Sequence, residues 1–344
     1  MIISTLLLSS SLTAAELEPT LLTQVWLTAF DQDVSEQSDP AGYGDPEDDQ
    51  GFKLRRARAG LSGSDGDFHY ALSFGMSSGA DGLAYSDGTV GIVDAYGGWK
   101  LHQDVTVLGG VQKVPFGRES LLSSSELVFQ ERAVTSNHIA PGRELGLLAK
   151  STALGADLQL GVFNGNGSIT GDDNDGLMYA VRLGYNVGEG STSSTYGIAE
   201  SLLLSVAGNA YYDQGTATNT LAYGGDVLLR WSGLALLAEV HLATIEPGNT
   251  NIDVPEVSAS TTRFGAVAQA GWSFGQWEPA VRVELFDDDQ SLEDNGDIMK
   301  ITAGITGHFA EDTVRAGFSY DHREETGGQS LANDTARLFF QMRY

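Results

Sequence analysis

Arginines that alternate with apolar residues are the side chains of this sequence with the clearest potential for chemistry. Arg182 lies between Val181 and Leu183, and Arg230 follows Leu229 in the same way. Successive side chains of an extended strand point to opposite faces, so each arginine projects away from its apolar neighbours. A guanidinium on such a face either pairs with a carboxylate of the protein or contacts a charged solute.

The same alternation assigns further charged residues to one shared face. A midplane arginine or lysine facing lipid costs about 2–4 kcal/mol, so in a membrane barrel this face is the interior. The basic residues predicted to line it are Arg56, Arg58, Arg182, Arg230, Arg282, Lys300, Arg315 and Arg337, with Arg323 and Arg343 on the same parity. Acidic residues predicted to share it are Asp94, Asp226, Glu239, Glu284 and Asp321.

Catalysis is not expected from the other polar residues. The six histidines are scattered, and the chain has no G-x-S-x-G motif and no cysteine. The stretch GDDNDG at 171–176 resembles a calcium loop, but Gly171 and Arg182 occupy positions that need acidic residues. The sequence therefore predicts no enzyme, no cofactor and no metal site.

Composition bounds the class of protein. The 46 acidic and 19 basic residues give a net charge of −27, which argues against nucleic-acid binding. Residues 1–15 are apolar or small without a charge, and predict a secretory signal cleaved near Ala15. Residues 16–344 would then form a single domain. No later segment has the roughly 18 apolar residues of a membrane helix, which leaves a closed barrel for crossing a membrane.

Alternation at strand length recurs along the whole chain. Phe68, Tyr70 and Leu72 share one face, and His69 and Ala71 share the other. Counting gives about sixteen segments, mostly near the 9 to 11 residues of a tilted membrane strand. They are 21–31, 51–62, 67–77, 89–101, 104–114, 143–151, 156–164, 176–188, 199–212, 220–232, 234–245, 261–273, 277–287, 297–309, 312–323 and 332–344. The fold class predicted is all-β, a 16-stranded antiparallel transmembrane β-barrel, against a soluble β-sandwich as the alternative.

The connections and the aromatic residues agree with a barrel of the bacterial outer membrane. Short turns alternate with long acidic loops at 32–50, 246–260, 288–296 and 324–331, as at the periplasmic and extracellular ends of such barrels. The acidic loops suggest a hypothesis of weak divalent-cation bridging to lipopolysaccharide. The five tryptophans are expected in the aromatic girdles at the two membrane interfaces.

One connection differs from the others. Residues 115–142 are long and carry apolar side chains such as Leu127, Val128 and Phe129. Long loops in compact β proteins are usually functional or disordered, and this one is expected to pack inside something. A sixteen-stranded barrel is wide enough to need a constriction, so the segment is predicted to be an inward-folded constriction loop.

The chain resembles the phosphate- and polyphosphate-selective porin family, porin O/P. The resembling stretches are GFKLRRARAGLSG at 51–63, residues 93–132 with KVPFGRE, GRELGL at 142–147 and GVFNGNG at 161–167. The resemblance implies a homotrimer of sixteen-stranded barrels whose third extracellular loop forms an eyelet. Carried over by position, the eyelet would include Arg118, Glu119, Glu131, Arg132 and Arg143.

The sequence departs from the family in its lysines. Anion-specific members use lysine clusters, whereas this chain has only Lys53, Lys100, Lys113, Lys150 and Lys300. The function predicted is therefore passive diffusion of small hydrophilic solutes, with a phosphate-like anion preference rather than strict selectivity. The alternative is a structural or receptor barrel with a closed lumen.

Overall fold

The computed structural model describes residues 16–30, 51–77, 90–167, 176–248, 259–328, 330 and 333–344. These residues form sixteen strands and two short helices. The strands are β1 (Glu16–Phe30), β2 (Gly51–Asp65), β3 (Phe68–Ser77), β4 (Gly91–His102), β5 (Val105–Lys113), β6 (Arg143–Ala153), β7 (Ala156–Phe163), β8 (Met178–Gly188), β9 (Leu203–Gln214), β10 (Thr218–Trp231), β11 (Leu234–Pro247), β12 (Thr261–Trp272), β13 (Trp277–Asp287), β14 (Ile298–Phe309), β15 (Val314–Glu325) and β16 (Thr335–Arg343). The helices are α1 (Arg118–Leu121) and α2 (Val134–His138).

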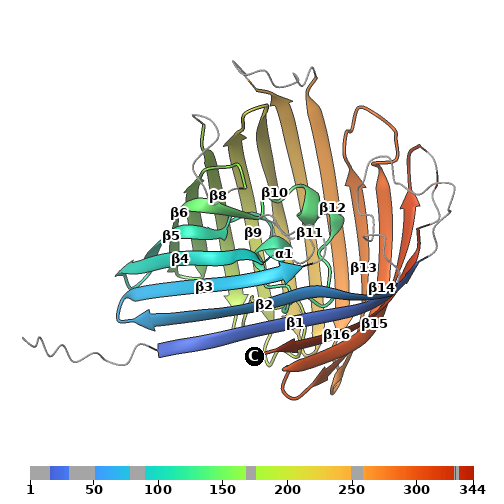
Figure 1. Cartoon of the computed structure of the whole chain (residues 1–344), viewed down its shortest axis with the longest axis horizontal. Helices are drawn as coiled ribbons and strands as arrows, with labels where there is room; N and C mark the ends of the chain where they lie inside the picture. Colours follow the sequence, from blue (N-terminus) through green and yellow to red (C-terminus); the bar gives the residue numbers. More distant parts are fainter. Residues whose placement is uncertain are drawn as a thin grey trace, which may run out of the picture.

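The strands close into one barrel (Figure 1). Each strand pairs antiparallel with its sequence neighbours, and β1 closes the sheet by pairing with β16 from Leu22 opposite Arg343 to Phe30 opposite Thr335. Closure leaves no unpaired strand edge. The predicted sixteen-stranded antiparallel barrel is confirmed. Neither helix in the described part of the chain is long and apolar enough to cross a membrane.

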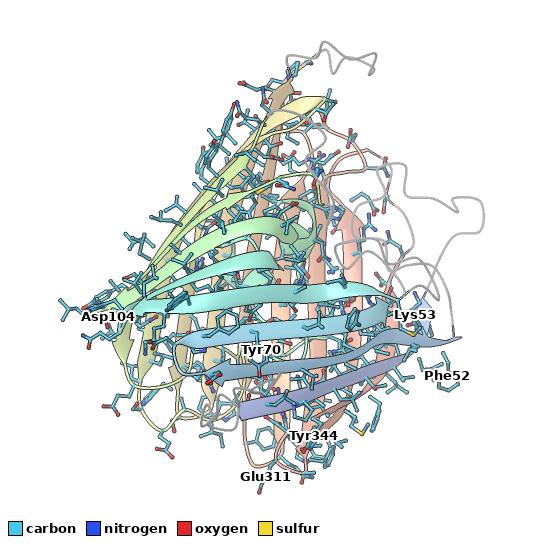
Figure 2. All side chains as sticks on the ribbon, turned by 60° about the vertical axis from the view of Figure 1, so that its left-hand side comes forward. Phe52, Lys53, Tyr70, Asp104, Glu311 and Tyr344 are labelled. Atoms are coloured by element: carbon cyan, nitrogen blue, oxygen red, sulfur yellow. The ribbon has the colours of Figure 1, made fainter. Side chains whose placement is uncertain are left out.

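Apolar side chains cover the outside of the barrel and polar ones the inside. Along β8, Tyr179, Val181 and Leu183 are exposed, whereas Arg182 is 7% exposed because the barrel interior covers it. An apolar outer face is what a lipid-embedded barrel requires. Figure 2 shows the outer side chains standing away from the sheet around its circumference.

The two ends of the barrel differ in their connections. The turn between β6 and β7 has positive φ at Leu154 (54°) and Gly155 (82°), as expected for a two-residue type I′ hairpin. In Figure 2 the short turn at Asp104 lies at one end of the barrel, and Phe52 and Lys53 lie at the other. Short turns face the periplasm in outer-membrane barrels. The predicted signal segment 1–15 and the loop 32–50 lie outside the described residues.

Two sequence-based expectations need correction. The strand expected from residue 199 begins at Leu203, so the connection between β8 and β9 is the long segment 189–202 at the short-turn end. Trp26 is not in a membrane girdle: it is 4% exposed inside the barrel, because its parity along β1 matches the buried Gln24 and Thr28. The other tryptophans are exposed near the short-turn end: Trp99, Trp231, Trp272 and Trp277.

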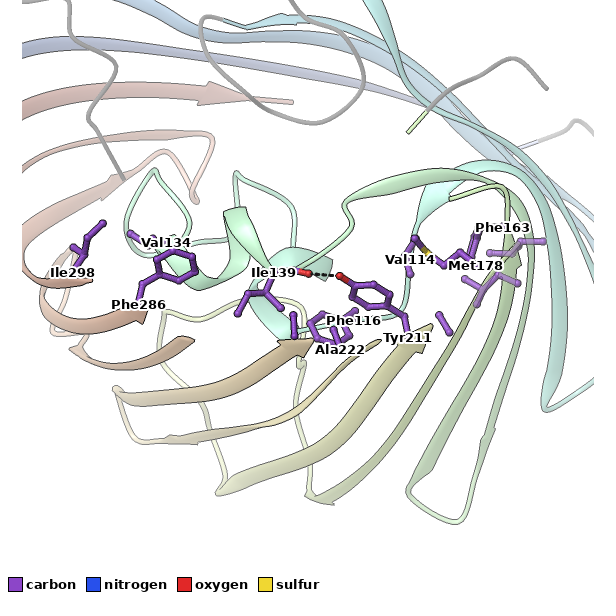
Figure 3. Packing of buried hydrophobic residues seen from close by; sticks show 14 residues of the cluster. Val114, Phe116, Val134, Ile139, Phe163, Met178, Tyr211, Ala222, Phe286 and Ile298 are labelled. Atoms are coloured by element: carbon purple, nitrogen blue, oxygen red, sulfur yellow. Dashed lines mark hydrogen bonds between the residues drawn. The ribbon is translucent and has the colours of Figure 1, made fainter. Parts of the chain in front are cut away.

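Part of the barrel interior is an apolar core. Phe116, Val134 and Ile139, from the connection between β5 and β6, pack with Tyr211 and Phe286 of the barrel wall (Figure 3). The Phe116 and Tyr211 rings meet edge to face at 5.0 Å, and the Tyr211 hydroxyl donates to the Ile139 carbonyl at 2.9 Å. The connection is therefore part of the folded core.

Candidate pore constriction

The segment between β5 and β6 lies inside the barrel, and α1 appears within the ring of strands in Figure 1. The Val114 N–H donates to the Gly142 carbonyl at 3.0 Å and closes the neck of the segment. Further in, α2 approaches β12 so closely that a Cβ on Gly265 would lie 1.4 Å from Thr135 Oγ1. Glycine at this position allows the helix to lie against the wall. We call residues 114–142 the constriction loop.

Glu119 holds the two halves of the constriction loop together. Its Oε2 accepts hydrogen bonds from the Ala133 N–H at 2.7 Å and the Ser136 hydroxyl at 3.0 Å. Its own N–H donates to Glu239 Oε1 on β11 at 2.6 Å, and Arg282 of β13 lies 3.3 Å from its Oε1. Burial raises the pKa of Glu119, and the Arg282 guanidinium partly opposes that shift. Glu119 is thus a positioning residue that does not face an open passage.

Arg118 and Arg182 share one carboxylate. Arg118 Nε lies 2.7 Å from Asp226 Oδ1 and its Nη2 donates to Ser205 at 2.7 Å. Arg182 Nη1 lies 2.5 Å from the other oxygen of Asp226. A buried charge is stabilised by an opposite charge, and here one carboxylate pairs with two guanidiniums. Both arginines face the interior as predicted, but they anchor α1 to β8 and β10.

Glu131 is clamped by two consecutive arginines. Arg55 binds it through Nε and Nη2, each at 3.0 Å, and Arg56 Nη2 lies 2.8 Å from Oε1. Neighbours in a regular strand cannot both face inward. The pairing of β1 with β2 shifts register between Gln24 and Val25, and this bulge directs Arg55 inward beside Arg56. For this reason, the alternation of side chains along the strand did not identify Arg55 as an interior residue.

Three other arginines support the loop through its backbone carbonyls. Arg315 is fully buried and donates to the carbonyls of Ser125, Leu127 and Val128 at 2.9–3.2 Å. Arg282 donates to the Glu131 carbonyl at 2.8 Å and pairs with Glu284 at 2.7 Å. Arg132 donates to the Glu119 and Leu122 carbonyls at 3.2 and 2.9 Å. These charges fix the shape of the loop.

A cavity of about 440 Å³ separates residues 121–126 of the loop from the interior faces of β1–β6 and the end of β16. Four cationic and two acidic side chains line it: Arg58, Lys113, Arg143, Arg343, Asp94 and Glu126. We call it the cationic cavity. Arg143 pairs with Asp94 at 3.0 Å, Arg343 pairs with Glu126, and Arg58 donates to Ser124 Oγ at 3.3 Å. Among the charged side chains that line this cavity, the cationic ones therefore outnumber the acidic ones.

Lys113 was not expected at this site. Its Nζ donates to the Leu121 and Leu122 carbonyls at 2.9 and 2.6 Å, at the end of α1. Its position as the last residue of β5, directly before the constriction loop, is the signal that would have identified it.

The remaining predicted pore-lining residues also face the interior. Arg230 donates to the Ser191 carbonyl at 3.0 Å, and Lys300 lies 3.3 Å from Glu284. Arg337 pairs with Asp321 at 3.4 Å, and its Cζ lies 4.3 Å from the Trp26 ring centroid. Arg55 Cζ lies 5.3 Å from the same centroid. None of these residues lines the cationic cavity. Within the described ranges, no group of three or more metal-ligating side chains could hold an ion.

Comparison with known proteins identifies the family. Residues 28–209, which include β2–β8 and the whole constriction loop, match the family model of phosphate-selective porin O and P. The chain belongs to this family. It is a porin of the bacterial outer membrane. No curated protein matches this porin.

Solved structures similar to this porin have the same architecture. The loop-L8 deletion mutant of OmpT from Vibrio cholerae superposes with a TM-score of 0.63 at 9% identity, covering 96% of this chain and 100% of that one. An anion-selective porin from Comamonas acidovorans has a TM-score of 0.62 at 12% identity, with the same coverage. OmpF of Salmonella typhi has a TM-score of 0.58 at 14% identity, covering 96% and 97%. At these identities the likeness concerns the fold.

Proposed function

We propose that this porin lets small hydrophilic anions, phosphate-like ones included, diffuse passively through the cationic cavity. The observation that carries the proposal is the lining of that cavity, where cationic side chains outnumber acidic ones by four to two. A fixed excess of positive charge raises the local concentration of anions and lowers that of cations. The driving force is the solute gradient together with any membrane potential, and no cofactor takes part.

The proposal assigns different roles to the predicted site residues. Arg58 and Arg143 contact the solute, because both line the cationic cavity. Arg118, Glu119, Glu131 and Arg132 instead hold the constriction loop in place through the bonds described above. The other interior residues set the background charge of the lumen: Arg56, Arg182, Arg230, Arg282, Lys300, Arg315 and Arg337.

The assembly we propose is a homotrimer in the outer membrane. Family resemblance supports it, and a solved form of the similar OmpT of Vibrio cholerae is a trimer. The exposed apolar residues of the outer face supply surface for lipid, lipopolysaccharide and subunit contacts. We also propose that residues 1–15 are a cleaved secretory signal, which N-terminal sequencing of the mature protein would test.

A barrel with a closed lumen, serving as a structural element or receptor, is the second candidate. It is favoured by the amount of chain inside the barrel, since the constriction loop and part of segment 189–202 are both buried there. The fold and family point to a channel rather than an enzyme.

The reversal potential in a planar bilayer under a salt gradient separates these candidates. Discrete conductance steps would support the proposal if the reversal potential has the sign expected for a pore that passes anions more readily than cations. A cation-selective reversal potential would mean that the acidic loops dominate, and would refute the anion preference. No conductance from folded, purified protein would favour the closed barrel.

A further inference from the structure

The connection between β8 and β9, residues 189–202, enters the barrel from the short-turn end and reaches the constriction loop. Thr195 is 2% exposed and Tyr196 is 3% exposed, although the segment consists mainly of Gly, Ser and Thr. The Thr195 N–H donates to the Glu126 carbonyl at 3.1 Å, and its hydroxyl accepts from the Val128 N–H at 3.1 Å. We call residues 189–202 the periplasmic segment.

Tyr196 anchors the tip of the periplasmic segment. Its ring packs with Val128 and Phe129 of the constriction loop, and its hydroxyl donates to the Ser125 carbonyl at 3.3 Å. The Arg315 Cζ lies 4.2 Å from the ring centroid, in cation–π geometry. The same guanidinium donates to three carbonyls of the constriction loop. Arg315 therefore joins the two inward segments.

Hydrogen bonds attach the rest of the periplasmic segment to the barrel wall. The Gly197 N–H donates to Ser273 Oγ at 3.1 Å, and the Ser232 N–H donates to the Ala199 carbonyl at 3.2 Å. Gly197 has φ +90°, and a Cβ there would lie 3.4 Å from Arg230 Nη2. The segment is thus built into the interior through both hydrogen bonds and a backbone conformation that favours glycine.

The position of the periplasmic segment determines which parts of the lumen stay open. Thr192 and Ser193 close one side of a second cavity of about 260 Å³, whose other walls include Arg118 and Arg182. These two arginines are already paired with Asp226. No residue of the segment lines the cationic cavity. The segment thus narrows the lumen beside β7–β9 and leaves the cationic side clear.

We propose that the periplasmic segment is a second constriction element that confines solute transit to the cationic cavity, and so sets both the pore's size limit and its charge preference. This inference rests on the proposed porin function. Two segments, one from each end of the barrel, then define the narrowest section together. Neither segment alone fills the lumen.

Replacing Tyr196 with alanine tests this inference. Tyr196→Ala removes the ring that packs on Phe129 and Arg315, so the segment should leave the lumen and open the second cavity to flow. Conductance increases with the open cross-section of a pore. If each cavity is treated as a sphere, the cross-sections of the two cavities together are about 1.7-fold that of the cationic cavity alone, so conductance should rise by about 1.7-fold. The anion preference should fall, because the added path has few unpaired charges. Tyr196→Phe, which keeps the ring, and Ile198→Ala, at a residue 61% exposed, should stay near wild type.

A second measurement keeps the test valid if Tyr196→Ala does not fold. The chain has no cysteine, so Ser193→Cys introduces a single thiol on the exposed part of the segment. Ser193 lines the second cavity and not the cationic cavity, so modification of this thiol by a bulky anionic reagent should leave single-channel current and anion preference unchanged. A current that falls after complete modification would mean that solute also passes through the second cavity and would overturn the inference, as would a folded Tyr196→Ala with wild-type conductance and reversal potential.

These outcomes are distinct from failure of the proposed function. If neither wild type nor any variant conducts, the porin proposal fails. If the wild type is closed and Tyr196→Ala conducts, the periplasmic segment is a plug, and confinement of transit to the cationic cavity is refuted.

Discussion

Removal of one charge from the cationic cavity should change ion selectivity by a calculable amount. A sphere of 440 Å³ has a radius of about 5 Å, so an ion at its centre lies about that far from Arg58. At 5 Å in water a unit charge contributes about 0.8 kcal/mol, which screening reduces to about 0.5 kcal/mol in 0.1 M salt. Arg58→Gln removes this attraction for anions and this repulsion for cations. The anion-to-cation permeability ratio should therefore fall by about fivefold.

The assay is the zero-current potential of single channels under a salt gradient, measured near 0.1 M and near 1 M. In 1 M salt the Debye length is about 3 Å, so the same substitution should change the ratio by less than about twofold. Lys100→Gln, at an exposed residue outside the cavity, makes the same charge change and should alter the ratio far less. An equal effect of both substitutions, or an Arg58→Gln effect independent of salt, would refute the assignment of solute contact to the cationic cavity.

Three further predictions concern the constriction loop. Phe116→Ala should destabilise the barrel by about 3–5 kcal/mol in urea unfolding, because the ring is fully buried. Burial of the ring, and to a lesser extent the charge of nearby Arg263, lowers the pKa of His138 from 6.5 to about 4. The folded protein therefore binds this proton more weakly than the unfolded chain does. The contribution of neutral His138 to the free energy of unfolding is therefore present above pH 6.5 and lost toward pH 4, by at most about 3 kcal/mol. Urea unfolding at several pH values should show a flatter pH dependence for His138→Gln than for the wild type. Glu131→Gln should cost about 1–3 kcal/mol in urea unfolding, since Arg55 and Arg56 lose their shared carboxylate.

Matched variants give each of these predictions a control. Phe52→Ala removes a ring that is 83% exposed, so a loss of stability equal to that of Phe116→Ala would contradict the role of the interior core. A wild-type pH dependence in His138→Gln would exclude His138 as its source. For Glu131, a double-mutant cycle with Arg55→Gln measures the coupling, and additive effects would mean that the clamp contributes nothing.

Local alternation was sufficient to predict the barrel and the direction of most interior charges. Arg182, Arg230 and Arg282 face the interior because the two-residue period of a strand continues without interruption around them. The period fails where the register shifts. The bulge at Arg55 depends on how β1 pairs with β2, and nothing within the β2 sequence encodes that pairing.

The function of interior side chains was harder to predict than their direction. Arg118 and Arg315 were expected at an open pore, but each binds carboxylates or carbonyls of a segment distant in the sequence. Such pairing depends on the tertiary placement of the constriction loop. The periplasmic segment was missed because its Gly, Ser and Thr composition resembles that of a solvated turn, and only Tyr196 distinguishes it.

The constriction loop also touches the seam where the barrel closes, which bears on the order of assembly. Gln24 of β1 donates to Gln341 of β16 at 2.7 Å and to the Ser124 carbonyl at 3.3 Å, while Gln341 donates to the Ser125 carbonyl at 3.4 Å. These contacts join the two ends of the chain to its middle, and such non-local contacts form late in folding. The loop can thus act as an internal template, on which the first and last strands meet in register when the cylinder closes.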